Sequence, residues 1–174
     1  MFRRLTIVAS IASLAIISLA IISLAASQPV LAQGATVTTH QLSADTANTM
    51  IMAAMEQCRK DGYKVAVAIV DRAGNLQAFV RDNGTGPQTM ETSRRKAFTS
   101  AAFGITSAEF ATRMANPAAA GLKDVTGVIA LGGGLPIKAG NEVLGGIGVG
   151  GAPGADKDEA CATAGLMKVA DQLK

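Results

Sequence analysis

The stretch that most constrains the fold is rich in glycine and reads EVLGGIGVGGAPGADKDEA over residues 142–160. Within it, residues 146–151 fit the G-x-G-x-x-G pattern of dinucleotide-binding loops, and Asp171 lies about where such folds place a ribose-binding acid. That fold needs a helix that begins inside the loop and a parallel strand after the helix. Here the glycines alternate with Ile147 and Val149, which is the period of a strand. We therefore predict a strand and not a pyrophosphate-binding loop.

Glycine weakens a strand unless another group must approach its backbone closely. The run of Gly145, Gly146, Gly148 and Gly150 therefore predicts backbone that lies against a ligand, a helix or another subunit. A tightly packed, bulged strand without a ligand is the alternative interpretation.

The N-terminus has the features of an export signal. Arg3 and Arg4 precede an uncharged apolar run, and Val30-Leu31-Ala32 places small residues at the usual cleavage positions. We predict a signal peptide over residues 1–32 and an exported protein, either periplasmic or secreted. The apolar run 5–27 is also long enough to span a bilayer, which takes about 20 residues. An uncleaved membrane anchor is therefore the alternative.

Residues 33–174 are long enough for one domain with its own core, and we find no linker within them. Without Arg3 and Arg4 the mature chain is close to neutral, and it has no basic stripe with interleaved aromatic residues. We therefore do not expect nucleic acid as a partner. A membrane contact is expected only through the N-terminal segment, if it stays uncleaved.

Apolar periodicity and turn residues predict the order α-β-β-α-α-β-β-β-α, in which hairpin connections dominate. This order predicts an α+β fold with a mainly antiparallel sheet covered by helices. The basic residues 94–96 should be partly solvated, and Asp156 with Glu159 should cap the last helix. The predicted elements are a helix capped by Ser43, strands Val65–Val70 and Leu76–Asp82, helices Gln88–Ala102 and Ser107–Met114, strands Gly127–Ala130, Leu135–Lys138 and Glu142–Gly150, and a helix Lys157–Leu173.

The two cysteines, Cys58 and Cys161, fall on the first and last predicted helices. An exported protein can keep a disulfide, but the sequence does not show whether the two Cα atoms come close enough to form one. Two separate buried thiols are the preferred interpretation, and a bridge between the two helices is the alternative.

Residues 127–166 resemble the C-terminal half of the GlcG/HbpS family of heme-binding proteins. The family pattern has a GG-x-PI segment, a glycine-rich strand, and a helix that begins with Asp and contains A-x-AG. One position departs from it, because Gly150 stands where the family usually has serine. The matching segments are Gly133–Ile137, Gly145–Ala152, Asp156, Ala164-Gly165, and upstream VAIVDRAGNL (67–76), RDNG (81–84) and RRKAFTSA (94–101).

The resemblance implies a compact, profilin-like α+β domain with a five-stranded antiparallel sheet. It also implies assembly into homo-oligomers and an association with heme binding, sensing or breakdown. Some relatives are secreted, which agrees with the predicted signal peptide. Fold resemblance alone does not transfer a function.

Heme binding requires an apolar slot, an axial ligand, and often a cation near the propionates. His40, the only histidine, is the candidate axial and metal ligand, and a solvated tail residue is the alternative role. Cys58, Tyr63 and the methionines are other possible ligands. Together the candidate heme-binding residues are His40, Arg81, Arg94, Arg95, Lys96, Gly146, Gly148 and Gly150.

An enzymatic function has less support, because no Ser-His-Asp order and no His/Cys cluster with zinc spacing occurs. Asp71, Asp82, Asp156 and Glu159 are carboxylates without an evident partner. We therefore favour an exported heme-binding protein that sequesters, buffers or reports heme. An oligomeric binding protein for another small ligand, such as an organic acid, is one alternative. A heme-degrading enzyme is the other.

Overall fold

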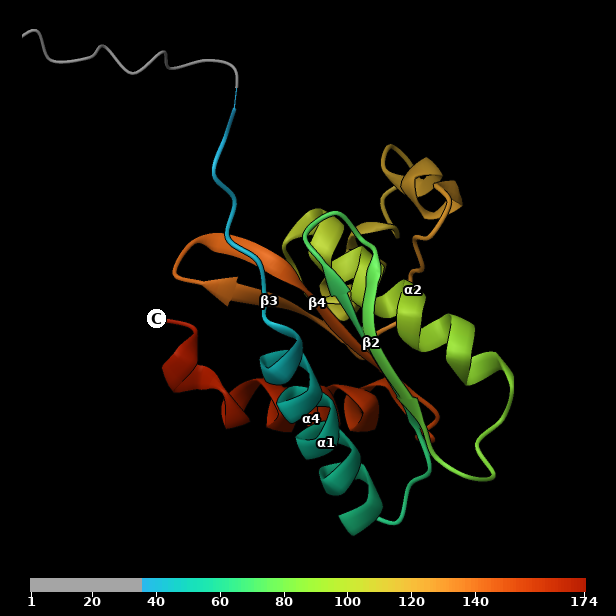
Figure 1. Cartoon of the computed structure of the whole chain (residues 1–174). Helices are drawn as coiled ribbons and strands as arrows, with labels where there is room; N and C mark the ends of the chain where they lie inside the picture. Colours follow the sequence, from blue (N-terminus) through green and yellow to red (C-terminus); the bar gives the residue numbers. More distant parts are fainter. Residues whose placement is uncertain (1–35) are drawn as a thin grey trace, which may run out of the picture. The chain divides into compact units, whose positions relative to one another are not determined.

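A sheet of four antiparallel strands lies between two layers of helices (Figure 1). The computed structural model describes residues 36–174, and residues 39–174 form one unit. The predicted signal peptide, residues 1–32, lies outside the described residues. Among the helices of residues 36–174, none has the length and apolar character needed to cross a membrane.

The strands lie in the order β2-β1-β4-β3, and every neighbouring pair is antiparallel. The α+β class and the antiparallel sheet are therefore confirmed, and the glycine-rich stretch is a strand of the ladder. The strand bounds are β1 (Ala66–Asp71), β2 (Leu76–Arg81), β3 (Gly134–Ala139) and β4 (Glu142–Gly150).

The prediction of five strands is wrong, because the segment 127–130 forms no strand. Side chains of the second long helix bind its backbone instead. The Arg95 guanidinium donates to Val128 O, and Thr99 Oγ1 accepts the Ile129 N–H at 2.9 Å. Polar groups that a strand would pair in a ladder are thus paired with a helix.

Helices α1 (Ala44–Lys60) and α4 (Ala155–Lys168) pack together over one face of the sheet (Figure 1). Ser43 caps α1 as predicted, because its side chain accepts from Thr46 N at 3.1 Å. The predicted apolar stripe of α1 is also confirmed. Its buried residues are Ala47, Met50, Ile51, Ala54, Met55 and Cys58.

A disulfide joins Cys58 of α1 to Cys161 of α4, with their Cα atoms 5.5 Å apart. The preferred interpretation of two separate thiols is therefore wrong. Both cysteines are fully buried in the core where α1 and α4 pack together, and this packing brings their Cα atoms within bridging distance.

Helix α2 (Gln88–Phe103) covers the opposite face and lies directly on β4. A Cβ added to Gly146 would lie 2.2 Å from Ala97 O, and one added to Gly148 would lie 2.1 Å from Ser93 O. Of the three groups that could lie against these glycines, the structure shows the helix. Beyond α2 follow α3 (Ser107–Arg113) and the short 3-10 helix η2 (Ala120–Asp124).

The start of α4 differs from the sequence prediction. Its N-cap is Gly154, no side chain caps it, and the helix begins two residues before the predicted start at residue 157. Asp158 takes up the role of ordering the preceding loop, because its Oδ1 accepts the Ala152 N–H at 3.0 Å. The regular helix ends at Lys168, and a 3-10 turn, η3 (Ala170–Gln172), follows.

Candidate functional site

His40 is held by a carboxylate from the far end of the chain. It lies just before α1, and its Nδ1 is 2.8 Å from Oε2 of Glu142, the first residue of β4. A carboxylate only accepts hydrogen bonds, so the neutral imidazole carries its proton on Nδ1 and keeps a free lone pair on Nε2. The His40 side chain is 76% exposed, so this nitrogen lies at an accessible position.

A cavity of about 210 Å³ adjoins His40. The turn between β1 and β2 supplies its other wall with Asp71, Arg72 and Ala73. Burial acts to raise the pKa of Asp71, but hydrogen bonds from Asn75 and from backbone N–H groups of the turn outweigh it and lower that pKa. Asp71 is therefore engaged in ordering the turn, and Arg72 is the cation beside the cavity.

Sequence reasoning missed Glu142 and Arg72 as members of this site. The motif DRAGN around Arg72 indicated only a turn, and Glu142 only the start of a strand. The start of β4 lies near the segment before α1 only in the folded protein, because the register of β3 and β4 brings it there. A histidine followed by a distant acid gives no local signal for that contact.

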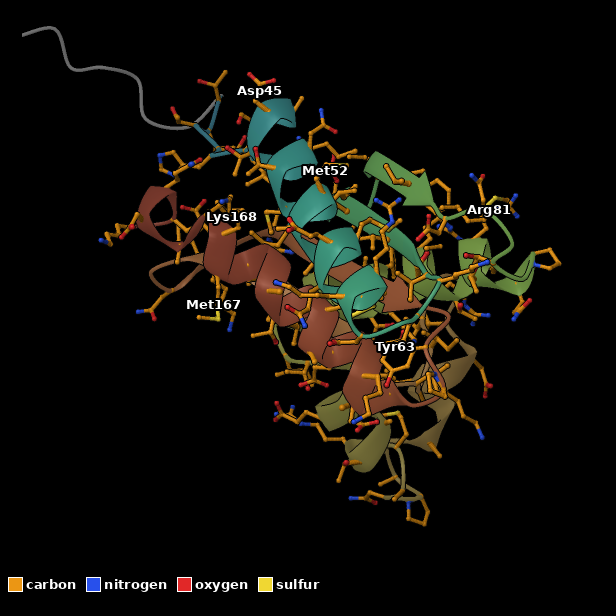
Figure 2. All side chains as sticks on the ribbon, turned by 90° about the horizontal axis from the view of Figure 1, so that it is seen from below. Asp45, Met52, Tyr63, Arg81, Met167 and Lys168 are labelled. Carbon is orange, nitrogen blue, oxygen red and sulfur yellow. A yellow bond between two sulfur atoms is a disulfide. The ribbon has the colours of Figure 1, made fainter. Side chains whose placement is uncertain are left out.

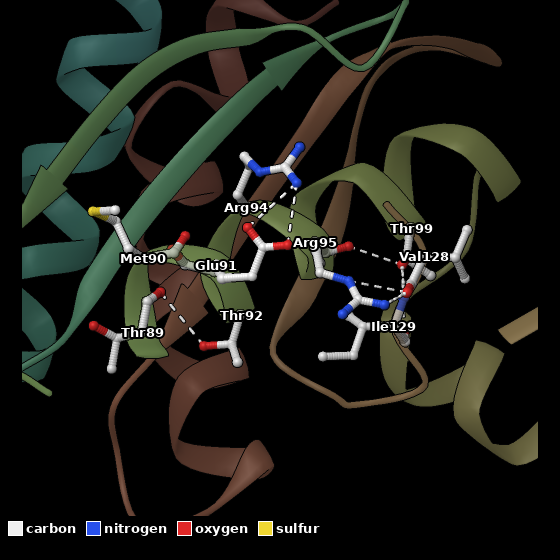
Figure 3. Close-up of polar contacts among 10 residues, drawn as sticks. Thr89, Met90, Glu91, Thr92, Arg94, Arg95, Thr99, Val128 and Ile129 are labelled. Atoms are coloured by element: carbon white, nitrogen blue, oxygen red, sulfur yellow. Dashed lines mark hydrogen bonds and ion pairs between the residues drawn. The ribbon is translucent and has the colours of Figure 1, made fainter. Parts of the chain in front are cut away.

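The basic residues of α2 lie elsewhere. Arg94 contacts Glu91, with its Nη2 3.3 Å from both carboxylate oxygens, and Arg95 reaches the Val128 carbonyl (Figure 3). Both are on the helix that covers the face opposite α1. Arg81 is exposed at the last position of β2, and the structure does not bring it to His40.

Lys96 is buried, which corrects the expectation that it is partly solvated. Its side chain is 2% exposed, and its Nζ donates to Asp158 Oδ2 at 2.7 Å and to Val149 O at 2.9 Å. Burial raises the pKa of Asp158 in spite of the Lys96 ammonium. The ion pair therefore links α2 to α4 inside the protein.

Among the three glycines predicted to contact heme, Gly150 borders a cavity. Gly146 and Gly148 face α2, whereas Gly150 lines a space of about 320 Å³ between α2 and the start of α4. The remaining carboxylates do not gather: residues 36–174 contain no group of three or more His, Cys, Asp or Glu side chains placed to hold a metal ion.

Comparison with known proteins identifies relatives over most of the described chain. The family model "Haem degrading protein HbpS-like" matches residues 42–167. Protein GlcG of Escherichia coli strain K12 is 30% identical over 108 residues, which cover 62% of this chain and 80% of GlcG.

Two solved structures are similar to this chain in fold. A double mutant of Streptomyces reticuli HbpS is 40% identical, with a TM-score of 0.74 over 82% of this chain and 97% of that chain. The structure described as a PduOC:heme complex is 25% identical, with a TM-score of 0.68 over 74% of this chain and 95% of that one. The similarity covers both layers of helices and the sheet.

Proposed function

The chain belongs to the HbpS-like family of haem degrading proteins, and on this premise we propose that it is an exported protein that binds heme. A member of the same fold, PduOC, was crystallised with heme, which supports the choice of ligand. The proposal concerns binding first, because the contact between His40 and Glu142 is the one that would orient a metal-binding imidazole.

The observation that carries the proposal is the contact between His40 and Glu142. Metal-binding histidines usually donate their second ring N–H to a carboxylate or a carbonyl, which fixes the ring and raises the basicity of the ligating nitrogen. Glu142 is such a carboxylate for His40, because its Oε2 lies 2.8 Å from His40 Nδ1 and accepts the N–H. His40 Nε2 would bind the heme iron, and the Arg72 guanidinium would meet a propionate. The cavity between them, about 210 Å³, is smaller than a typical ligand pocket of about 300–1,000 Å³, so part of the heme would lie outside it.

Bound heme would supply a redox-active iron that can be stored, buffered or reported. In this proposal the protein's residues bind and orient the group. Heme degradation is the second candidate function, and the description of the family model favours it. Incubation of the loaded protein with a reductant distinguishes the two, because degradation releases iron and bleaches the porphyrin spectrum.

The disulfide supports export. A buried Cys58–Cys161 bridge persists in the periplasm or outside the cell and is rare in the cytosol, where thiols are kept reduced. Export through the predicted signal peptide would bring the chain to such a compartment. Mass determination of the protein from the culture medium and the periplasm tests both the location and cleavage after Ala32.

We also propose that the protein forms a homo-oligomer. In residues 39–174 the two outer strands of the sheet, β2 and β3, each have one unpaired edge, and such edges are normally covered or paired. Figure 2 looks onto the outer surface of α1 and α4, where Met52 and Met167 are 53% and 72% exposed. Native mass spectrometry measures the number of subunits.

A hemin titration of the wild-type protein and His40→Ala tests the ligand assignment. We expect the wild type to give a saturable Soret band that is shifted or lost in His40→Ala. Lys60→Ala, an exposed change on α1, is the matched control and should behave as the wild type does. A Soret band unaltered in His40→Ala would overturn the assignment of His40, and a wild type without saturable uptake would overturn heme binding itself.

A further inference from the structure

The loop between β2 and α2 forms one wall of a second cavity. This loop has the sequence DNGTGP over residues 82–87 and leads directly into α2. The cavity measures about 370 Å³, near the lower end of the range of about 300–1,000 Å³ for small-molecule pockets. Its wall includes Gly84, Thr85 and Gly86 of the loop, Gln88 of α2, and Tyr63 and Lys64 before β1. Tyr63 lies beyond the end of α1 in Figure 2.

Thr85 is a buried polar residue without a partner. It is only 9% exposed, and its Oγ1 makes no hydrogen bond. A buried hydroxyl without a partner has lost its hydrogen bonds to water and gained none in return, so native proteins rarely leave one in this state. Because Thr85 lines this cavity, a ligand there would supply the missing acceptor.

The N-terminus of α2, like that of α4, has no side-chain cap. Ser43 and Thr106 cap α1 and α3 through their side chains, whereas Pro87 at the N-cap of α2 makes no such bond. In the described part of the chain, the N–H groups of Gly86 and Gln88 have no acceptor among the backbone or side chains. Free N–H groups at the start of a 16-residue helix favour an anion, and the helix dipole adds to this preference.

Lys64 brings a positive charge to the same loop. A Cβ added to Gly84 would lie 3.4 Å from Lys64 Nζ, so the ammonium lies against the loop backbone. The neighbouring acid, Asp82, is paired mainly with Arg59, and Lys64 makes only a smaller contribution to the lowered pKa of Asp82. Its carboxylate accepts two hydrogen bonds from Arg59, at 2.9 and 3.0 Å, and so already has a counter-ion.

We propose that this cavity binds the oxyanion group, phosphate or carboxylate, of a small molecule. Lys64 supplies the charge, the Gly86 and Gln88 N–H groups donate hydrogen bonds, and the Thr85 hydroxyl donates another. The space beside the backbone at Gly84 and Gly86 is taken by the flexible side chains of Lys64 and Gln88, which would turn toward the ligand. The site lies at the α2 end of the β1–β2 hairpin, whereas His40 adjoins the turn at residues 71–73, at the other end. It is therefore independent of the proposed heme site.

Titration of the ¹⁵N-labelled protein with sodium phosphate, and separately with sodium succinate, tests this proposal by NMR at constant ionic strength. We expect saturable shifts of the Gly86 and Gln88 amide signals with at least one anion. A response to phosphate alone identifies a phosphorylated ligand, and a response to succinate alone identifies a carboxylate. Shifts that do not saturate, or that sodium chloride reproduces, would overturn the proposal.

Matched variants separate the site from general charge effects. Lys64→Ala and Thr85→Val should each weaken the binding of the responding anion at least about tenfold. Lys123→Ala and Thr163→Val, exposed changes elsewhere, should leave it unchanged. Equal affinity in Lys64→Ala and the wild type would contradict the site. Loss of anion binding in His40→Ala would contradict its independence, while an intact anion response beside failed hemin uptake would leave this proposal standing.

Discussion

Lys96 Nζ lies 2.7 Å from Asp158 Oδ2, and both side chains are at least 95% buried. This single contact holds α2, on one face of the sheet, to α4, which packs on the other. Asp158 also orders the segment between β4 and α4, because the other oxygen of its carboxylate accepts the Ala152 N–H. The geometry of both faces therefore depends on an ion pair that has almost no contact with water.

Lys96→Met should lower the free energy of unfolding by about 3–5 kcal/mol near neutral pH, because it leaves a buried carboxylate without its counter-ion. Burial already raises the pKa of Asp158, and loss of Lys96 raises it further. The native state then holds a proton that the unfolded chain releases near pH 3.9, so the variant loses stability as pH rises.

Urea denaturation at about pH 4.5, pH 6 and pH 7.5 measures this dependence. The difference in unfolding free energy between wild type and Lys96→Met should grow with pH. Lys123→Met, at an exposed position, is the control and should show no such trend. A constant or shrinking difference would contradict the assignment of the raised pKa to Asp158.

Gly148→Ala should destabilise the protein by about 1–3 kcal/mol, because its Cβ would lie 2.1 Å from Ser93 O and force α2 away from β4. Gly121→Ala is the matched control: a Cβ there meets nothing within 4 Å, and its backbone is not in the left-handed region. Thermal unfolding of both variants measures the effect. Equal melting temperatures would show that α2 can shift without cost.

The sequence predicts the fold where local patterns decide it. The stripe of α1, the β1–β2 hairpin and the strand β4 follow from apolar spacing and turn residues, and all three are confirmed. The strand predicted at 127–130 failed because Arg95 and Thr99, distant in sequence, bind its backbone. Such contacts between distant residues leave no periodic pattern in the sequence, so a short stretch of sequence does not predict them.

The candidate site is predictable only in part for the same reason. His40 could be singled out because it is the only histidine. Its partner Glu142 is 102 residues away, and only the tertiary structure brings the two together. The sequence places Lys96 in a run of basic residues that was expected to be partly solvated. The packing of α2 on β4 instead buries its side chain beside Asp158.

Removal of the disulfide in Cys58→Ala/Cys161→Ala should reduce the free energy of unfolding by about 2–5 kcal/mol. The bridge spans 103 residues of sequence, so its loss frees a long loop in the unfolded chain. Chemical denaturation of this variant, beside wild type with and without a thiol reductant, measures the change. If the oxidised wild type is no more stable than the variant, the bridge contributes nothing to stability.

Glu142→Gln should weaken hemin binding about 10–100-fold while the protein remains folded, because the amide no longer fixes the His40 ring as a charged acceptor. His40 and Glu142 are both exposed, so the change should alter stability little. Hemin titration of Glu142→Gln beside Glu56→Gln, an exposed acid of α1, separates this effect from the loss of surface charge. If the two variants bind hemin equally well, Glu142 does not orient the ligand, and His40 must then act without it or not at all.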